Sequence, residues 1–342
     1  MSNLSSESTC IILSTSYYPH FSVAAHRASR FAYYLSQFGW NVKVIANEIA
    51  CNREYDPTLD SDDYSKHVLA RLPTPKGNIF SKLITYIIAF ARNPLVTFKY
   101  IAFTFLGKFP HYVEPSYISG AINAVTSLIA EDPTIVDKSI ILATTPSPST
   151  LAAAYEIHKK YSIPWIADFR DTYDIAQQAS SVTSQRSFIR YEPSICSTAS
   201  VLTTVCPALQ NHLQSRHTQD ICVIPNGFNR NQLNLSLNIP APPNKKFTIA
   251  YTGNLPYPLV NPIPLFISLE SLLQAHRIPV YLFEFFYAGP SSNQVSSLLK
   301  DYPLLASCSS VNDSIYYLHS LQTQQSANLL LVLTSVSYTH LT

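Results

Sequence analysis

The sequence predicts an α/β protein that folds as two Rossmann-like parallel-sheet domains facing a cleft. Three observations favour this class. Short β-branched runs alternate with segments of helical spacing. The strand candidates are almost continuously apolar, as strands covered by helices on both faces are. The same alternation occurs twice, and a chain of 342 residues with 46% hydrophobic residues is long enough to bury two cores.

The first domain is expected to span residues 1–228. Its strand candidates are 10–15, 41–46, 139–144, 164–168, 200–205 and 221–225. Its helix candidates, which carry apolar residues at helical intervals, are 23–38, 114–129, 149–161 and 207–215. A polar, proline-rich stretch at 229–246 follows and predicts a linker.

The second domain is expected over residues 247–335, where a strand at 247–253 opens a new alternation. The elements after it are a helix near 265–276, a strand at 280–288, a helix near 294–301, a short strand near 304–308, a helix near 314–322 and a strand at 328–334. In open parallel sheets, ligands bind beyond the carboxyl ends of the strands. The loops directly after each strand are therefore the candidate site.

Composition excludes several classes of protein. A formal net charge of +2 gives no support for nucleic-acid binding, which needs clustered basic residues. The seven glycines lie too far apart for a dinucleotide-binding or Walker A loop. Neither the ten histidines nor the six cysteines show metal-ligand spacing, so we expect no metal and no resident cofactor. Without a recognisable signal peptide, the cysteines are interpreted as buried, reduced thiols in a cytoplasmic protein.

The segment 79–109 is the most apolar part of the chain, yet basic residues and an Asn-Pro pair interrupt it before it reaches the length of a membrane span. It predicts two amphipathic helices around Pro94. The favoured interpretation is a buried helical hairpin inserted in the first domain. The alternative is a basic, aromatic surface that makes peripheral contact with the inner face of a membrane and collects a lipid-linked substrate.

Three loops of the first domain offer polar groups. In the loop 16–27 they are His20, Ser22 and Arg27, which suit a phosphate at a helix start. In the turn after the strand 139–144 they are Thr145 and Ser147, which suit sugar hydroxyls. Helix capping by Ser22 and Ser147 explains these two loops as well.

The third loop is the stretch WIADFRDTYD, where Asp168, Arg170 and Asp171 follow a strand. A carboxylate there can hold sugar hydroxyls, and a guanidinium can meet phosphate. The alternative, favoured for Arg170, is an ion pair with Asp168 or Asp171 that fixes the loop. Asp168 is the better candidate for ligand contact.

Two further turns complete the candidate set. Asn226 and Gly227 follow the last strand of the first domain, and Gly253 and Asn254 follow the first strand of the second. Glycine at these positions permits positive φ and a close approach to a ligand, although a plain turn would use the same residues. No residue is singled out as catalytic.

The loops in this order resemble one family. The stretches STSYYPHFSVAAHRASRFAYYLSQFGWNVKVIA, IPWIADFRDTY, ASVLTTVCPALQNHL, VIPNGFN and FTIAYTGNL resemble the motif series of two-domain (GT-B) retaining glycosyltransferases, family 4-like. The likeness covers roughly residues 10–334. It implies two Rossmann-like domains, an acceptor side first and a nucleotide side second.

The resemblance also implies a function: transfer of a sugar from a nucleotide-sugar donor to a cell-envelope or polysaccharide acceptor, saccharide or lipid-linked, with retained anomeric configuration. The nucleotide sugar is then a substrate, with no cofactor and no metal. Gly253 and Asn254 would lie on the donor side, and the first loop, around His20 to Ser22, would face the diphosphate. Asp168, Arg170 and Asp171 would line or brace the cleft.

The sequence departs from the family in its second domain. Between Tyr251 and His276 there is no Lys or Arg, where the family places a basic pair for the diphosphate. The family's two spaced glutamates have no counterpart before the sequence ends. Measured against the family, the second domain is therefore expected to be incomplete, in a truncated chain of low or no activity with a non-native tail at 336–342. The alternatives are a non-catalytic nucleotide-sugar-binding or scaffold protein, and a nucleotide-sugar epimerase of similar architecture.

Overall fold

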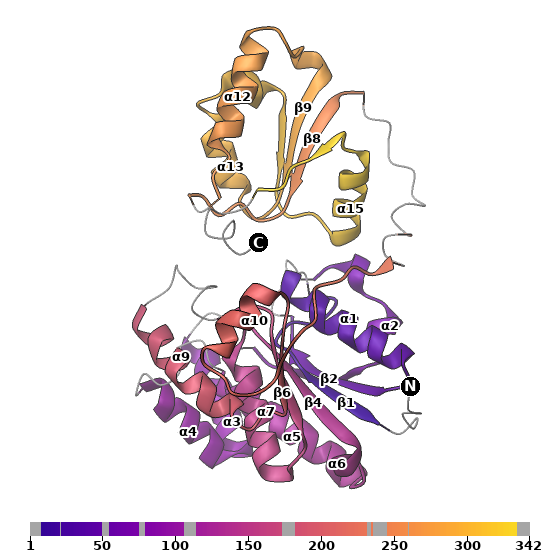
Figure 1. The fold of residues 1–342 in the computed structure, drawn as a ribbon, viewed down its shortest axis with the longest axis vertical. Helices are drawn as coiled ribbons and strands as arrows, with labels where there is room; N and C mark the ends of the chain where they lie inside the picture. Colours follow the sequence, from indigo (N-terminus) through magenta and orange to yellow (C-terminus); the bar gives the residue numbers. More distant parts are fainter. Residues whose placement is uncertain are drawn as a thin grey trace. The chain divides into compact units, whose positions relative to one another are not determined.

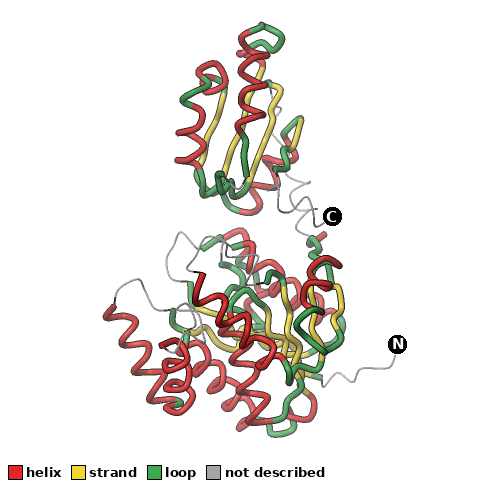
Figure 2. Tube along the Cα trace, turned by 60° about the vertical axis from the view of Figure 1, so that its left-hand side comes forward, coloured by secondary structure: helices red, strands yellow, loops and turns green. Residues whose placement is uncertain are grey.

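The computed structural model describes residues 8–20, 22–49, 55–74, 79–105, 114–172, 182–230, 234, 245–258 and 260–333, without the side chains of 79–82, 104–105 and 182–188. The chain divides into two compact units, Met1–Gly227 and Phe228–Thr342, called unit 1 and unit 2 below. In each unit, helices flank a sheet of parallel strands (Figures 1 and 2). Most of the expected linker and all of the expected tail lie outside the described residues.

Unit 1 contains a seven-stranded sheet in the order β3-β2-β1-β4-β5-β6-β7, with every pair parallel. Its strands are β1 (Thr9–Leu13), β2 (Asn41–Asn47), β3 (Val68–Leu72), β4 (Ser139–Thr144), β5 (Trp165–Phe169), β6 (Val201–Thr204) and β7 (Ile221–Val223). The chain moves outward from β1 through β2 to β3 and then returns to place β4 on the other side of β1. The sheet therefore has a topological switch point between β1 and β4, where α/β proteins bind ligands.

Helices cover both faces of this sheet. They are α1 (Val23–Gln37), α2 (Asp62–Ser65), α3 (Ile79–Arg92), α4 (Pro94–Phe105), α5 (Pro115–Glu131), α6 (Ile135–Lys138), α7 (Pro148–Tyr161), α9 (Val182–Cys196) and α10 (Pro207–Gln214), with a 3-10 turn η2 at Pro57–Leu59. The main core joins α5, α7 and α9 to inward side chains such as Ile11, Leu13 and Trp165. Helix α1 packs on the other face (Figure 1).

Unit 2 contains a four-stranded parallel sheet in the order β10-β9-β8-β11, with a second switch point between β8 and β11. Its elements are β8 (Phe247–Thr252), α12 (Ile263–Gln274), a 3-10 turn η3 (Val280–Leu282), β9 (Phe283–Ala288), α13 (Ser292–Leu299), α14 (Pro303–Ser307), β10 (Ser309–Asn312), α15 (Tyr317–Ser326) and β11 (Leu329–Leu330). The edge strand β11 is exposed, at 44% for Leu329 and 51% for Leu330, and no residue of α15 is buried.

The predicted class of two Rossmann-like parallel sheets is confirmed, and every strand expected in unit 1 is present. The expected strand at 304–308 is wrong, because that segment is the short helix α14 and the strand β10 follows it. Pro303 opens this helix, and the buried carboxylate of Glu270 accepts hydrogen bonds from the backbone N–H groups of Leu304 (3.3 Å) and Leu305 (2.8 Å).

Three other expectations need correction. Strand β9 starts three residues late, because the η3 turn precedes it, and β11 is far shorter than 328–334. The two helices around Pro94 are confirmed as α3 and α4, but they are not a buried hairpin. Their outer face is exposed, with Ile87 at 59% and Phe98 at 65%.

Candidate functional site

The candidate site of unit 1 lies at the carboxyl ends of the central strands. Parallel register places Thr144 of β4, Asp168 of β5 and Thr203 of β6 side by side on three neighbouring strands. The backbone N–H of Thr145 donates to the carbonyl of Asp168 at 2.9 Å, so the turn after β4 begins against the end of β5. The loops after β4 and β5 therefore meet beside the switch point, the region where sheets of this class bind ligands.

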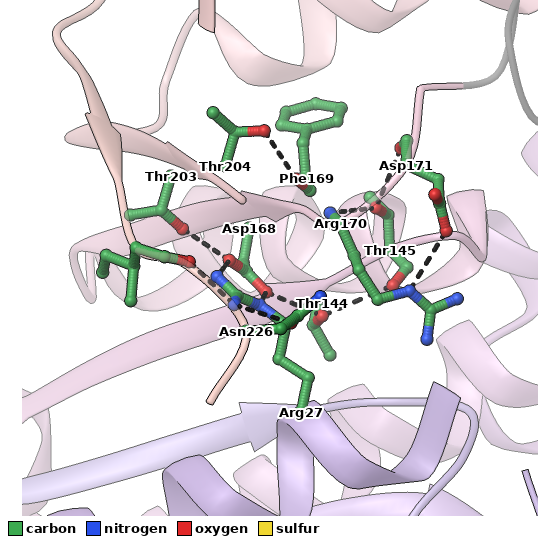
Figure 3. A network of polar contacts seen from close by, with 11 residues as sticks. Arg27, Thr144, Thr145, Asp168, Phe169, Arg170, Asp171, Thr203, Thr204 and Asn226 are labelled. Atoms are coloured by element: carbon green, nitrogen blue, oxygen red, sulfur yellow. Dashed lines mark hydrogen bonds and ion pairs between the residues drawn. The ribbon is translucent and has the colours of Figure 1, made fainter. Parts of the chain in front are cut away.

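Asp168 is the centre of a buried hydrogen-bond network (Figure 3). Its carboxylate accepts from Arg27, with Nε 2.9 Å from Oδ2 and Nη2 2.7 Å from Oδ1. It also accepts from the hydroxyls of Thr144 (2.8 Å) and Thr203 (2.6 Å). The Asp168 side chain is 0% exposed and that of Arg27 is 5% exposed. With four donors on two shielded oxygens, the expectation that Asp168 contacts a ligand does not fit this geometry.

Arg27 extends the same network to the loop after β7. Its Nη1 donates to the carbonyl of Ile224 at 2.9 Å and to the side-chain oxygen of Asn226 at 3.2 Å. Arg30, one turn along α1, donates to the carbonyl of Gly227. Arg27 and Asn226 thus join α1, β5 and the last loop of unit 1, so both have a structural role there.

Arg170 and Asp171 form the ion pair that the sequence suggested as the alternative. Arg170 Nε lies 3.1 Å from Asp171 Oδ2. The hydroxyl of Thr145 accepts from the backbone N–H of Arg170 (3.2 Å) and donates to the carbonyl of Asp171 (3.3 Å), which fixes the loop to the turn after β4 (Figure 3). Arg170 Nη1 is enclosed and has no hydrogen-bond partner among the described residues. The N–H groups of Arg170 Nη1 are therefore donors that no described residue uses.

The two expected serines cap helices. Ser22 Oγ accepts from the backbone N–H of Ala24 at 3.0 Å, at the start of α1, and Ser147 Oγ accepts from that of Ser149 at 3.3 Å, at the start of α7. The interpretation of both as helix caps is confirmed. His20 is half-buried, and its backbone forms an isolated bridge with Tyr55.

His26 is a site residue that the sequence did not single out. Tyr18 Oη lies 2.5 Å from His26 Nδ1. Burial, followed by the nearby positive charges of Arg30 and Arg170, lowers the pKa of His26 to about 4. The imidazole is therefore neutral at pH 7, and its Nδ1 is suited to accept a hydrogen bond from the tyrosine hydroxyl.

In unit 2, two turns after neighbouring strands approach closely. Gly253, after β8, has a φ of +151°, and its N–H donates to the carbonyl of Ala288 at 2.9 Å. A Cβ added to Gly289, after β9, would lie 2.0 Å from the carbonyl oxygen of Gly253. Only glycine fits at position 289, and the backbones of the two turns therefore pack directly against each other and form one surface.

Asn254 is held within that surface. Its side-chain oxygen accepts from Ser291 Oγ at 2.9 Å, and its carbonyl accepts from Tyr251 Oη at 2.8 Å. Tyr287 Oη donates to the carbonyl of Gly253 at 3.0 Å and accepts from the N–H of Ser291 at 3.1 Å. Gly253 and Asn254 therefore lie together, as expected, while Tyr287, Gly289 and Ser291 carry no local sequence signal that marks them.

Other expected features can be placed as well. Within the described residues, no three His, Cys, Asp or Glu side chains are grouped to hold a metal ion. None of the helices in the described parts of the chain has the length and apolarity needed to span a bilayer. The expectation that all cysteines are buried is wrong: Cys222 is exposed on the edge strand β7, and Cys206 is half-buried where α10 begins.

Comparison with known proteins shows the fold. No family model matches the sequence, and no curated protein matches it significantly. The structure resembles sucrose-phosphate synthase from Thermosynechococcus elongatus, with 14% identity over 94% of this chain and 74% of that chain and a TM-score of 0.56. The chain has a GT-B-type fold.

Two further structures agree with this fold. HepE from Anabaena, solved in complex with UDP-glucose, matches with 11% identity over 94% of this chain and 73% of that chain, and with a TM-score of 0.53. A UDP-N-acetylglucosamine 2-epimerase matches with 8% identity over 94% of this chain and 72% of that chain, and with a TM-score of 0.50. Identities this low show the architecture alone, because one fold hosts many activities.

Proposed function

We propose that this protein is a glycosyltransferase that moves a sugar from a nucleotide-sugar donor to a saccharide or lipid-linked acceptor of the cell envelope or of a polysaccharide. The observation that carries the proposal is Arg170. It is a guanidinium in the loop after β5 of a Rossmann-like sheet, held by Asp171 through Nε while Nη1 remains without a hydrogen-bond partner among the described residues. Such a group suits a phosphate oxygen.

The chemistry needs little more from unit 1 than positioned positive charge. When the sugar leaves its nucleotide, negative charge develops on the departing diphosphate, and a fixed cation stabilises it most where no reorganisation is needed. The hydrogen bonds from Thr145 hold the Arg170–Asp171 loop in place beforehand. Positioning of the acceptor hydroxyl supplies the rest of the rate. Retention of configuration is proposed from the motif resemblance.

Similarity to enzymes whose names or bound ligands include nucleotide sugars supports the choice of donor class. The test is calorimetry of the full chain against UDP, UDP-glucose, GDP and GDP-mannose, followed by NMR of any transferred sugar. We expect at least one nucleoside diphosphate to bind and its sugar to be transferred slowly, because the segment from Tyr251 to His276 has no basic residue. Absence of binding to the whole panel refutes the proposal.

An epimerase is the second candidate, favoured by the match to a UDP-N-acetylglucosamine 2-epimerase. Three of the four acidic residues in unit 2 are engaged within the fold. Glu270 accepts from the start of α14, Glu284 accepts from Ser310 and Thr248, and Asp313 accepts from Ser292. Since this leaves little carboxylate for proton abstraction in unit 2, transfer is the better-supported function. NMR of the nucleotide sugar without acceptor distinguishes them, because only an epimerase changes the sugar itself.

A binding or scaffold protein is the third candidate, and it follows from the same shortage of basic residues in unit 2. It predicts that the nucleotide sugar binds and is recovered unchanged in the presence of every acceptor tested. Any transferred sugar that depends on Arg170 contradicts it.

A further inference from the structure

The outer face of α3 and of the first part of α4 is apolar and open. Seven large hydrophobic side chains on these helices are between 38% and 85% exposed. They are Leu83, Ile84, Ile87, Ile88, Phe90, Leu95 and Phe98. We call these seven residues the α3–α4 face. Single exposed apolar side chains are ordinary, but a group of seven on two consecutive helices indicates a contact surface.

The inner side of α3 is firmly packed, so the exposed face is a feature of a well-anchored helix. Thr85 and Ala89 are buried against α5, and Ser119 of α5 donates to the carbonyl of Ala89 at 3.0 Å. Asn93, between α3 and α4, donates to the side chain of Asn123 at 2.7 Å and to the carbonyl of Ser119 at 3.2 Å. A helix that buries its main apolar surface in its own domain turns its large apolar side chains inward. Helix α3 does the reverse, because its small residues face inward and its large apolar residues face outward.

Basic residues lie on α3 and α4 and beside them. Every charged residue in 79–105 is basic, and of these Arg92 is exposed at the end of α3. Beside Leu95 lies a cavity of about 340 Å³ whose lining includes Lys159 and Lys160 from the last turn of α7.

The one acidic residue in that cavity lining is already paired. Glu156 Oε1 lies 2.5 Å from Lys99 Nζ and accepts from Tyr100 Oη at 2.9 Å. Lys99 neutralises the carboxylate of Glu156, whereas Lys159 and Lys160 keep their charges. The border of the face beside Leu95 is therefore electropositive.

We propose that the α3–α4 face docks on the surface of an anionic lipid bilayer. Apolar side chains of the face enter the boundary between headgroups and acyl chains, and Arg92, Lys159 and Lys160 meet the phosphates. The helix lies in the plane of the membrane and does not cross it, because the 14 residues of α3 are only about 21 Å long. Helices α3 and α4 lie on the outside of unit 1, with α5 and α7 between them and the sheet (Figure 1).

A second copy of the chain fits this face less well. A two-fold contact sets the same patch of both copies against each other, so a face whose only charged residues are basic would meet an identical basic face, with no acidic residue in 79–105 to balance it. Anionic phospholipid supplies both the apolar medium and the negative charge. The proposal concerns this surface alone and holds whether or not the protein transfers sugar.

The test is flotation of the full chain with vesicles of phosphatidylcholine alone and of phosphatidylcholine with phosphatidylglycerol. We expect binding to the anionic vesicles, weakened by salt. The double variant Ile87→Gln/Phe90→Gln, at side chains 59% and 50% exposed, should bind at least about tenfold more weakly because it removes buried apolar area. Arg92→Glu should weaken binding to anionic vesicles specifically.

The matched control is Ile267→Gln/Leu272→Gln, which alters a helix of unit 2 at side chains 55% and 40% exposed. It should float as the wild type does, and circular dichroism, which follows both units, should show that all variants are folded. The proposal is overturned if the wild type ignores anionic vesicles or if Ile87→Gln/Phe90→Gln floats equally well. It is also overturned if the wild type is a dimer that this double variant separates and vesicle binding is absent.

Discussion

The guanidinium of Arg27 in α1 and the carboxylate of Asp168 in β5 form a buried, two-point ion pair between residues 141 positions apart in the sequence. Neither group meets water to any extent, and the remaining donors of Arg27 reach the loop after β7. The pair therefore holds α1, β5 and that loop together at the carboxyl ends of the strands. Removing one partner leaves a buried charge without compensation, which destabilises the fold far more than replacing both partners by apolar residues.

Asp168→Ala should lower the free energy of unfolding of unit 1 by about 3–5 kcal/mol, because Arg27 is left unpaired in a shielded place. Both tryptophans, Trp40 and Trp165, lie in unit 1, so urea unfolding followed by tryptophan fluorescence reports this unit. The control is Asp171→Ala, at a carboxylate 40% exposed, which should change stability by less than about 1 kcal/mol. Equal effects of the two variants contradict the structural role of Asp168.

Arg170→Ala should weaken the binding of a nucleoside diphosphate by about tenfold or more while the stability of unit 1 changes by less than about 1 kcal/mol. Asp171→Asn should preserve or strengthen binding, because it releases Arg170 Nε from a competing carboxylate. Calorimetry measures both, with Arg190→Ala, an exposed cation on α9, as the control. Undiminished affinity in Arg170→Ala removes the anion-binding role.

Gly289→Ala should destabilise unit 2 by about 2 kcal/mol or more, because the new Cβ would lie 2.0 Å from the carbonyl oxygen of Gly253 and 2.7 Å from Tyr287 Oη. Gly227→Ala is the matched control, since nothing lies within 4 Å of its added Cβ. Circular dichroism follows both units, whereas tryptophan fluorescence follows unit 1 only. For Gly289→Ala we expect the unfolding transition to shift when it is followed by circular dichroism and to stay unchanged when it is followed by tryptophan fluorescence. If the dichroism transition does not shift, the two turns can move apart without cost.

The stability of unit 1 should fall as the pH drops from 6.5 towards 4. The folded-state pKa of His26 is about 4 and its ordinary value is 6.5. Between these values the unfolded chain binds a proton that the folded chain excludes, so protonation favours unfolding, by about 2–3 kcal/mol at the lower end. His26→Gln should flatten this part of the profile, measured by urea unfolding at a series of pH values. Identical slopes in variant and wild type would assign the dependence to other groups.

Much of the fold follows from local pattern, and the exceptions have long-range causes. Strands β1, β4 and β5 each contain a run of at least three consecutive apolar residues, so the sequence predicts them directly. Strand β3 escapes prediction because Arg71 lies within it. Its guanidinium donates to the carbonyls of Tyr17, Tyr18 and Asn47, partners that no local window contains.

The candidate site shows the same division. The loops after the strands can be identified from sequence, because the chain order of strands and turns indicates them. An ion pair of Arg170 with Asp168 or Asp171 could also be expected, but the choice of Asp171 and the burial of Asp168 could not, because they depend on which side chain reaches which partner. Asp168 turns to Arg27 and to threonines of two neighbouring strands, which leaves Arg170 to pair with the adjacent Asp171.

The exposed edge of unit 2 has a practical consequence for anyone who handles this protein. Among the described residues, β11 is the border strand on this side of the sheet, and it presents Leu329 and Leu330 together with backbone groups that can pair with another chain. Concentrated samples should therefore associate through this edge, slowly and independently of Ile87 and Phe90. Light scattering against concentration should reveal it, and a charge introduced at Leu330 should keep the protein monodisperse.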